Sequence, residues 1–385
     1  ESVGTVVSKP LPPWYGKGGG ANVVHVRPGA TGKGDGSSWS DAVTDFHKGV
    51  LMLTETRNEL WLAGSNVLAE AQGEYAFGTA AVLRGGFTGI ESSPAERKAG
   101  ARSVLDGDRK YNPLSFRNDA AVTVESIEFR DAVSRGIMKT GGGGDLTVTN
   151  CVIFRARHNP AQAWAKGGTF TGTADATLRL LDTAVVECGY SVGGLCLADS
   201  GLGVGCNTFK EVVIDGCRFE NCARTGTYQA LSGSTLYISN ARATVRRTAF
   251  VGNGAMAGNG TGGDLIRIEG KSDGSRFVNC AFVGNTVNSS GAPSCVLGVN
   301  MSQGNACSIE NCTFAYNVGY NQSGTFKSAR TLEVMGGEVS VSNSVFWGNV
   351  RHVRCPSAVE IRVRDGASAA VGYCLFGGRG EGWVS

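Results

Sequence analysis

The chain has 385 residues, of which 41% are hydrophobic, and this is enough apolar material for a large folded core. Its 36 lysines and arginines nearly balance 33 aspartates and glutamates, and no long basic run occurs, so nucleic acid is not an expected partner. No run of about 18 apolar residues occurs either, so we expect no direct membrane insertion. The 58 glycines follow no collagen-like period and indicate many turns between short strands.

The first part of the chain predicts a tail followed by a cap. Residues 1–21 are rich in proline and glycine and are typical of a flexible tail or linker. Val23–Val26 has the composition of a strand. From Trp39 to Leu53, apolar residues recur at helical spacing, which predicts an amphipathic helix over the open edge of the first coil. Short strands are expected at 59–63 and 80–84.

A repeat dominates the rest of the chain. One apolar anchor recurs about every 32 residues, and apolar residues also precede it at fixed positions. Between them the two-residue alternation slips once, where Asn150, Asn279, Asn311 and Asn343 lie. Asparagine tolerates left-handed backbone, so a corner is expected there. The anchors are Phe129, Ile153, Val185, Phe219, Phe250, Phe282, Phe314, Phe346 and Phe376.

Short strands and corners at this period predict an all-β fold, a right-handed parallel β-helix with about 32 residues per coil and an N-terminal amphipathic helix cap. The segment 22–121 should hold the cap and the first irregular coils, and 122–385 the regular coils. No amphipathic segment follows the last anchor, so we expect an uncapped C-terminal end that either self-associates or continues into further chain.

The cysteines occupy repeated positions. Those two residues before an anchor are expected to be small buried side chains without a redox role. Cys188 and Cys222 each lie three residues after an anchor, and adjacent coils bring such positions within disulfide range. They form a candidate disulfide, and Cys280 with Cys312 form a second pair that could bond.

The quartets at 250–253, 282–285, 314–317 and 346–349 match an FxxN motif, and 262–266 matches a GGA-I element. On these motifs the chain resembles the polymorphic outer-membrane-protein-like β-helix surface proteins of bacteria over roughly residues 23–380. The resemblance implies an exported protein, extracellular or on a bacterial cell surface, and often adhesin-like. The same pectate-lyase-like superfold also hosts enzymes that cleave pectin and alginate.

Polar and aromatic residues that follow the anchors of adjacent coils are the candidate site. Aromatic faces stack on sugar rings and arginine pairs with carboxylate or sulfate, so they could line a groove for an acidic glycan. The alternative is that they are ordinary loop residues. The candidate binding residues are Arg155, Arg157, Trp164, Tyr190, Arg224 and Tyr228. If the protein is an enzyme, the candidate catalytic residues are His158, Tyr190, Tyr228, Arg155 and Lys166.

No cofactor is expected, and no metal site is predicted. A lyase of this fold needs a base and a cation or metal to neutralise the substrate carboxylate. Asp106 and Asp108 are the closest acidic pair, and they are expected to mark a turn, so calcium has no clear acidic cluster. A second charged column is expected to form cross-strand ion pairs. It holds Arg267, Glu269, Glu333, Glu360, Arg362 and Arg364.

These observations favour a secreted or cell-surface protein that presents an extended, non-catalytic binding face to a glycan or protein ligand. One alternative is a polysaccharide lyase or glycoside hydrolase acting on an acidic polysaccharide, so enzymatic activity is left open. Another is a structural filament or spacer module.

Overall fold

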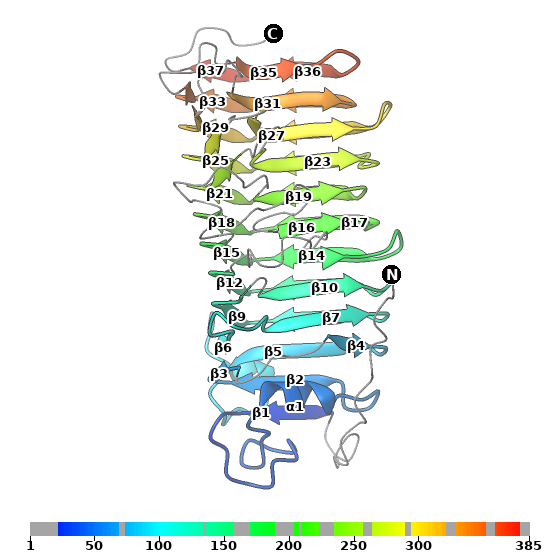
Figure 1. The fold of residues 1–385 in the computed structure, drawn as a ribbon, viewed down its shortest axis with the longest axis vertical. Coiled ribbons are helices and arrows are strands. Elements are labelled where there is room, and N and C mark those ends of the chain that lie inside the picture. Colours follow the sequence, from blue (N-terminus) through cyan, green and yellow to red (C-terminus); the bar gives the residue numbers. More distant parts are fainter. Residues whose placement is uncertain are drawn as a thin grey trace, which may run out of the picture.

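The structure is a computed structural model, and short parallel strands stack in it along one axis into a rod (Figure 1). The residues that it describes are 22–68, 74–133, 136–156, 170–188, 204–207, 209–222, 235–256, 264–288, 294–320, 329–351 and 359–377.

Four parallel sheets run along the rod, and we name them A to D. Sheet A contains, in spatial order, β1 (Val23–Val26), β2 (Glu59–Ala63), β5 (Ala81–Phe87), β8 (Val122–Glu125), β11 (Leu146–Thr149), β14 (Thr177–Leu181), β17 (Glu211–Asp215), β20 (Arg242–Arg246), β24 (Ser275–Val278), β28 (Ala306–Glu310), β32 (Glu338–Ser342) and β36 (Ser368–Gly372). Sheet B contains β3 (Ser65–Val67), β6 (Ser103–Asp106), β9 (Ile127–Arg130), β12 (Val152–Phe154), β15 (Ala184–Val186), β18 (Arg218–Glu220), β21 (Ala249–Val251), β25 (Ala281–Val283), β29 (Thr313–Ala315), β33 (Val345–Trp347) and β37 (Leu375–Gly377).

Sheets C and D complete the cross-section. Sheet C contains β4 (Tyr75–Phe77), β7 (Leu114–Asn118), β10 (Ile137–Gly141), β13 (Phe170–Thr171), β16 (Val204–Asn207), β19 (Leu236–Ser239), β23 (Ile266–Gly270), β27 (Ser294–Met301), β31 (Ala329–Gly336) and β35 (Val359–Val363). The short sheet D contains β22 (Gly254–Met256), β26 (Thr286–Asn288), β30 (Val318–Tyr320) and β34 (Val350–Arg351).

Each strand pairs with its equivalent in the next coil, about 32 residues later. Phe282 pairs with Phe314, and Phe314 with Phe346. The all-parallel pairing and this period confirm the predicted parallel β-helix. The strands expected at 23–26, 59–63 and 80–84 are also confirmed as β1, β2 and β5.

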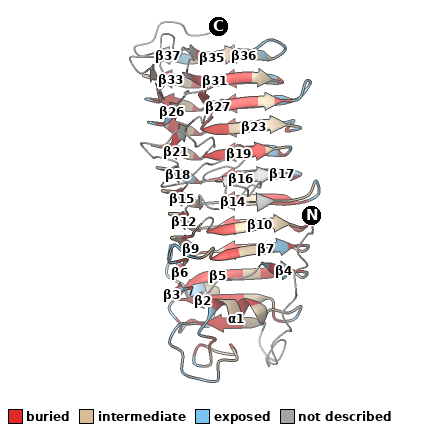
Figure 2. Ribbon diagram, in the orientation of Figure 1, coloured by how far each residue is buried: buried red, intermediate tan, exposed pale blue. Residues whose placement is uncertain are grey.

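The anchors form the core of the rod. Equivalent positions in adjacent coils are about 4.8 Å apart, so identical side chains can stack along the axis. From Phe219 to Phe376 the ring centroids of successive anchors are 4.3 to 5.2 Å apart, and neighbouring ring planes lie within 13° of parallel. Buried residues therefore recur in every coil (Figure 2).

Two columns of left-handed residues turn the chain at the ends of each sheet B strand. The predicted asparagine corner is confirmed, because Asn150, Asn279, Asn311 and Asn343 have φ of 49° to 56°. The second corner directly follows the sheet B strand, and this second column consists of Asp131, Arg155, Glu187, Asn221, Gly252, Gly284, Tyr316 and Gly348. Glycine and asparagine suit such corners because they tolerate positive φ.

The asparagines of the FxxN quartets form a continuous ladder inside the rod. The Oδ1 atom of Asn317 accepts hydrogen bonds from the backbone N and the Nδ2 of Asn285, at 3.1 and 2.9 Å. Its own Nδ2 donates to the carbonyl of Phe282 at 2.9 Å. Asn253, Asn285 and Asn349 repeat this pattern, so this column of asparagines has a structural role.

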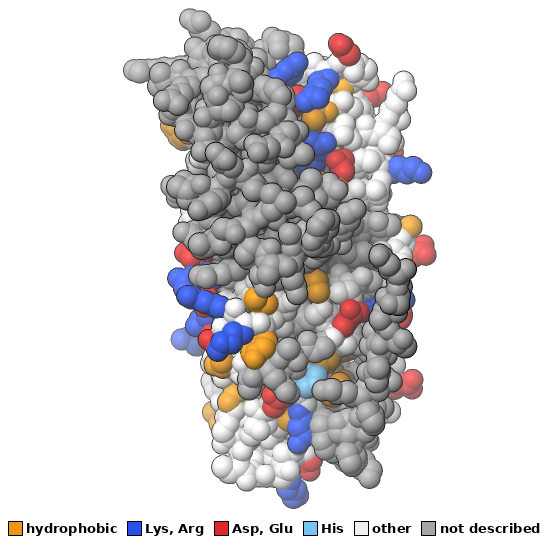
Figure 3. All heavy atoms as spheres, viewed as in Figure 1, with side chains coloured by type: hydrophobic (Ala, Val, Ile, Leu, Met, Phe, Trp, Pro, Cys, Tyr) orange, Lys and Arg blue, Asp and Glu red, His pale blue; other side chains and the backbone are white. Residues whose placement is uncertain are grey.

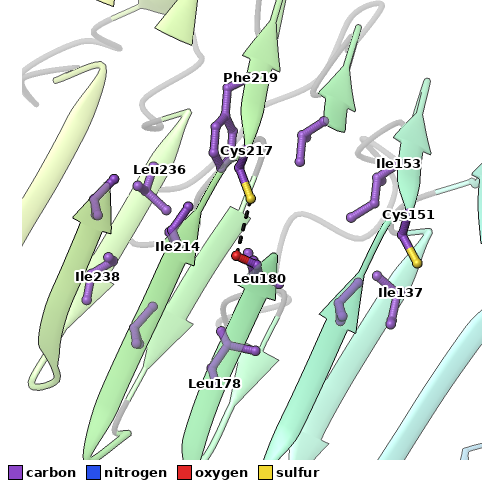
Figure 4. Close-up of a cluster of buried hydrophobic side chains, with 14 of the residues drawn as sticks. Ile137, Cys151, Ile153, Leu178, Leu180, Ile214, Cys217, Phe219, Leu236 and Ile238 are labelled. Atoms are coloured by element: carbon purple, nitrogen blue, oxygen red, sulfur yellow. Dashed lines mark hydrogen bonds between the residues drawn. The ribbon is translucent and has the colours of Figure 1, made fainter. Parts of the chain in front are cut away.

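Of the cysteines two residues before the anchors, Cys151, Cys217, Cys280 and Cys312 are buried, as predicted, and Cys374 is half-buried. The Cys217 thiol donates to the Leu180 carbonyl at 3.3 Å, within a cluster of apolar side chains (Figure 4). Burial raises the pKa of Cys151 and Cys217 to about 12, so both remain thiols at neutral pH. Cys188 and Cys222 are also buried free thiols in this structure, and their disulfide stays a prediction.

The structure does not support the predicted amphipathic helix cap from Trp39 to Leu53. Only six residues are helical in this region, in α1 (Phe46–Leu51), which contacts β1 and β2. Ahead of α1, Ser38 and Asp41 bond to each other in a local turn. The Trp39 indole donates to the Glu91 carbonyl at 2.7 Å, so this side chain packs outside the helix.

Candidate functional site

Most residues of the predicted groove lie outside the described part of the chain. These are Arg157, His158, Trp164, Lys166, Tyr190, Arg224 and Tyr228. Arg155 is described, and it occupies a left-handed corner after β12 with φ of 52°. Its Nε donates to Glu187 of the next coil at 3.0 Å, and its guanidinium lies 4.4 Å from the centroid of the Phe154 ring. The Arg155 charge is therefore already paired.

The second charged column lies on sheet C, where the predicted cross-strand pairing is found between Glu333 and Arg364, whereas Arg267 pairs with Glu269 of its own strand. Glu333 is fully buried and accepts from Arg330 Nη1 at 2.8 Å and from Arg364 Nε at 2.7 Å. Arg267 donates to Glu269 at 3.1 Å and to Asp264 at 2.7 Å. These contacts hold the charges in place, and removing one member would leave an uncompensated buried charge.

Two further residues, Asp264 and Arg330, form ion pairs with the charged column and were not predicted from the sequence. Asp264 precedes β23, and its Oδ1 accepts from both the backbone N and the thiol of Cys295, at 3.1 and 3.0 Å. Arg330 lies at the start of β31, next to Cys295 in the strand pairing. Their separation in sequence gives no local signal, because only the stacking of coils brings them together.

Glu360 is a buried carboxyl at the end of the asparagine ladder. It accepts from the Thr331 hydroxyl at 2.5 Å and from Asn349 Nδ2 at 3.2 Å. Burial raises the pKa of Glu360, and the two hydrogen bonds oppose that shift. The Glu360 carboxyl therefore loses its proton at a higher pH than an exposed glutamate would.

No group of three or more histidine, cysteine or acidic side chains that could hold a metal ion occurs among the described residues. The predicted turn at Asp106 and Asp108 is confirmed, since the Asp106 carboxylate accepts from the Asp108 backbone N at 2.8 Å. Lys110 pairs with Asp108 at 2.6 Å. In the described ranges, no helix has the length and apolar character needed to cross a membrane.

A cavity of about 340 Å³ lies near the N-terminal end of the rod. The loop after α1 and the edge strand β4 line it, chiefly with apolar side chains and with Thr54, Glu55 and Thr79. Tyr75 lies in its wall and hydrogen-bonds His47 Nδ1 at 2.8 Å. Burial raises the pKa of Tyr75, so the phenol stays neutral.

The outer side of sheet B is uncharged and mostly apolar from β21 to β37. The anchors point inward, so the residues on either side of each anchor point outward. We call this surface the sheet B face. It consists of Ala249, Val251, Ala281, Val283, Thr313, Ala315, Val345, Trp347, Leu375 and Gly377. The outer side of sheet A in the same coils is polar, with Arg276, Ser308, Glu310 and Ser340 among its residues.

Exposed aromatic side chains accompany the sheet B face. Tyr316 is 59% exposed, Trp347 43% and Tyr373 94%. Tyr316 and Tyr373 also occupy the two left-handed corners that flank the strands, both with φ of 54°. In the sequence, both positions carry tyrosine where the three preceding coils carry glycine or asparagine, and the predicted groove after the anchors does not include them.

The charge pattern elsewhere is mixed. In Figure 3, lysine and arginine side chains lie interspersed with aspartate and glutamate over the described part of the visible face. Comparison with known proteins adds no relative: no family model, no curated protein and no solved structure matches the chain. The parallel β-helix and the surfaces described above therefore stand on the sequence and the geometry alone.

Proposed function

We propose that the protein is a secreted or cell-surface β-helix of bacteria that presents an extended, non-catalytic binding face to glycan or protein. The observation that carries this proposal is the sheet B face with its exposed aromatic residues. Soluble proteins seldom expose contiguous apolar surface without a binding role, and tyrosine and tryptophan are enriched where proteins recognise ligands. The FxxN quartets, which resemble those of polymorphic outer-membrane-protein-like surface proteins, support the adhesin-like assignment and the extracellular location.

The charged side chains support a non-catalytic role. Among the described residues of sheet C, the buried carboxylates of Asp264, Glu333 and Glu360 are each held by arginine, threonine or amide donors. A general base must be free to reach the proton that it removes. These carboxylates are instead committed to contacts within the fold.

The test is to measure binding of the full chain to an array of polysaccharides and to bacterial and host surface proteins, with product detection on the same polymers. The proposal expects binding to at least one immobilised ligand without release of cleaved product. Release of unsaturated or reducing sugar ends would instead identify a lyase or a hydrolase. Concentration-dependent self-association of the folded chain, with no binding to any ligand, would identify a filament module.

A further inference from the structure

Two tyrosines occupy backbone positions that disfavour them. In the second column, the neighbours of Tyr316 are Gly284 and Gly348, and in the asparagine column Tyr373 follows Asn343. A bulky residue with positive φ is a genuine outlier, and strain of this kind clusters at functional sites. Both side chains are also largely exposed, so no core packing offsets the strain.

Glycines of the next coil make room for the rings at the end of the sheet B strands. A Cβ atom at Gly348 would lie 2.8 Å from Cε1 of Tyr316, and a Cβ atom at Gly377 would collide with the Trp347 indole. Each ring therefore extends along the rod over the backbone of the following coil. Because Ala315 pairs with Trp347, the two rings belong to adjacent coils at the same edge of the sheet.

Tyr373 stands at the opposite edge. Trp347 lies four positions after Asn343 of the asparagine column, so the two edges are about 13 Å apart. Between them lies a floor of short uncharged side chains, Thr313, Ala315 and Val345, of which Ala315 is buried and the other two are half-buried. Aromatic hot spots of protein interfaces cluster at the centre of the contact, whereas these aromatic side chains stand at opposite margins of a flat strip.

Exposed amides accompany the aromatic residues. Asn279, Asn311 and Asn343 precede Tyr373 in the same column, one per coil, and all three are exposed. Amides at this spacing can donate to and accept from hydroxyl groups along one side of a ligand. Apolar floor, flanking aromatic faces and a row of amides together suit a pyranose chain, whose rings have apolar faces and hydroxyl-bearing edges.

The surface carries no charge. From Ala249 to Gly377, neither the sheet B face nor its two corner columns contain a charged side chain. The nearest cation in the asparagine column is Arg247, and Asp215 holds it at 2.8 Å. An acidic polymer would find no counter-charge on this strip, whereas a neutral one needs none.

We propose that the sheet B face in the coils of β29, β33 and β37 binds a neutral polysaccharide chain, with Tyr316, Trp347 and Tyr373 stacking on its sugar rings. The inference rests on the proposed binding function and names its ligand class. It differs from the acidic glycan expected from the sequence, because the described surface offers aromatic faces and amides rather than cations.

The experiment uses the full chain and immobilised glucan, mannan and xylan, with pectate and alginate as acidic comparators. Each aromatic side chain is replaced by the residue that its own column or row already uses: Tyr316→Gly, Trp347→Ala and Tyr373→Asn. These variants suit the local backbone, so they should fold, which circular dichroism checks. We expect the wild type to bind a neutral polymer and each variant to bind it about tenfold more weakly.

Two controls separate stacking from other effects. Ile90→Ala removes an exposed apolar side chain far from the sheet B face and should leave affinity unchanged. Tyr316→Phe keeps the aromatic ring and should retain most of the binding. Raising the salt concentration should have little effect, because screening acts on charged contacts.

The outcomes distinguish this inference from the proposed function. Neutral-polymer binding that survives all three substitutions overturns the inference, as does binding to pectate or alginate alone. Binding to a surface protein without any glycan also overturns it, and leaves the broader binding function in place. Failure of the folded chain to bind any glycan or protein overturns both.

Discussion

At the scale of single residues, the left-handed corners differ in the residues that occupy them: many carry residues that suit the backbone, and two carry tyrosines that we assign to binding. Fifteen or more coil positions need positive φ, and asparagine or glycine fills many of them because these residues adopt it at low cost. Tyr316 and Tyr373 are the aromatic exceptions at these corners, and both are exposed. Local rules of this kind are broken mainly where a residue serves function rather than stability.

Tyr316→Gly should therefore stabilise the protein while weakening its binding. Relief of the left-handed strain should raise the free energy of unfolding by about 1 kcal/mol. Urea denaturation followed by circular dichroism measures it. Asn311→Gly is the matched control, since asparagine already tolerates its φ of 54°, and should change stability little. A loss of stability in Tyr316→Gly would argue that the ring packs productively on the fold.

The buried Glu360 carboxyl makes a pH-dependent contribution to the stability of the folded protein. Its pKa is raised in the folded state by burial, so the proton is held more tightly than in the unfolded chain. The stability that it contributes is present below the unfolded pKa of about 4.3 and is lost as pH rises through the higher folded pKa. Glu360→Gln mimics the protonated form and keeps the bonds to Thr331 and Asn349.

We therefore expect the difference in unfolding midpoint between Glu360→Gln and wild type to grow in favour of the variant as pH rises from 4 to 8. Thermal denaturation at a series of pH values measures it. Comparing the two proteins at each pH cancels the titration of the other carboxyl groups. A difference that stays constant with pH would show that Glu360 titrates alike in the folded and unfolded chains.

At the scale of elements, the asparagine ladder joins successive coils through side chains as well as through the strands. Asn317 accepts two hydrogen bonds from Asn285 and donates to the Phe282 carbonyl, all within the buried interior. Each coil is thus tied to both neighbours at the corner that leads into sheet D.

Asn317→Ala should cost about 3 kcal/mol of unfolding free energy, because it leaves buried donors and a buried carbonyl without partners. The measurement is again denaturant unfolding. Asn311→Gly serves as the control in the same coil, since the Asn311 amide is exposed. If the unfolding free energy of both variants fell by the same small amount, the asparagine ladder would add no stability beyond the backbone pairing.

At the scale of the whole molecule, structural features that repeat along the chain could be predicted from the sequence, and features that occur once could not. The apolar anchor recurs in every regular coil, and the asparagine corners and the cysteines recur at fixed positions in several of them, so their common period predicts the parallel β-helix. The helix cap failed because the local bonds between Ser38 and Asp41 interrupt an apolar spacing that looked helical. The contact of Asp264 with Cys295 joins residues from different coils and has no signal in either segment.

The candidate site was also predicted only in part. Arg155 was chosen for its chemistry, but stacking places Glu187 beside it and pairs its charge. The sheet B face could also be predicted, because the alternation that identifies the core residues identifies the outward residues as well. Trp347 and Tyr316 could have been identified by asking which members of a column depart from it.

The most direct test of the sheet B face as the binding surface is hydroxyl-radical footprinting of the full chain, with and without a bound neutral polysaccharide. We predict reduced oxidation of Tyr316, Trp347 and Tyr373 in the complex, with exposed Ile90 and Val67 unchanged. Unaltered oxidation of these three aromatic residues in a saturated complex would place the ligand elsewhere and contradict the account.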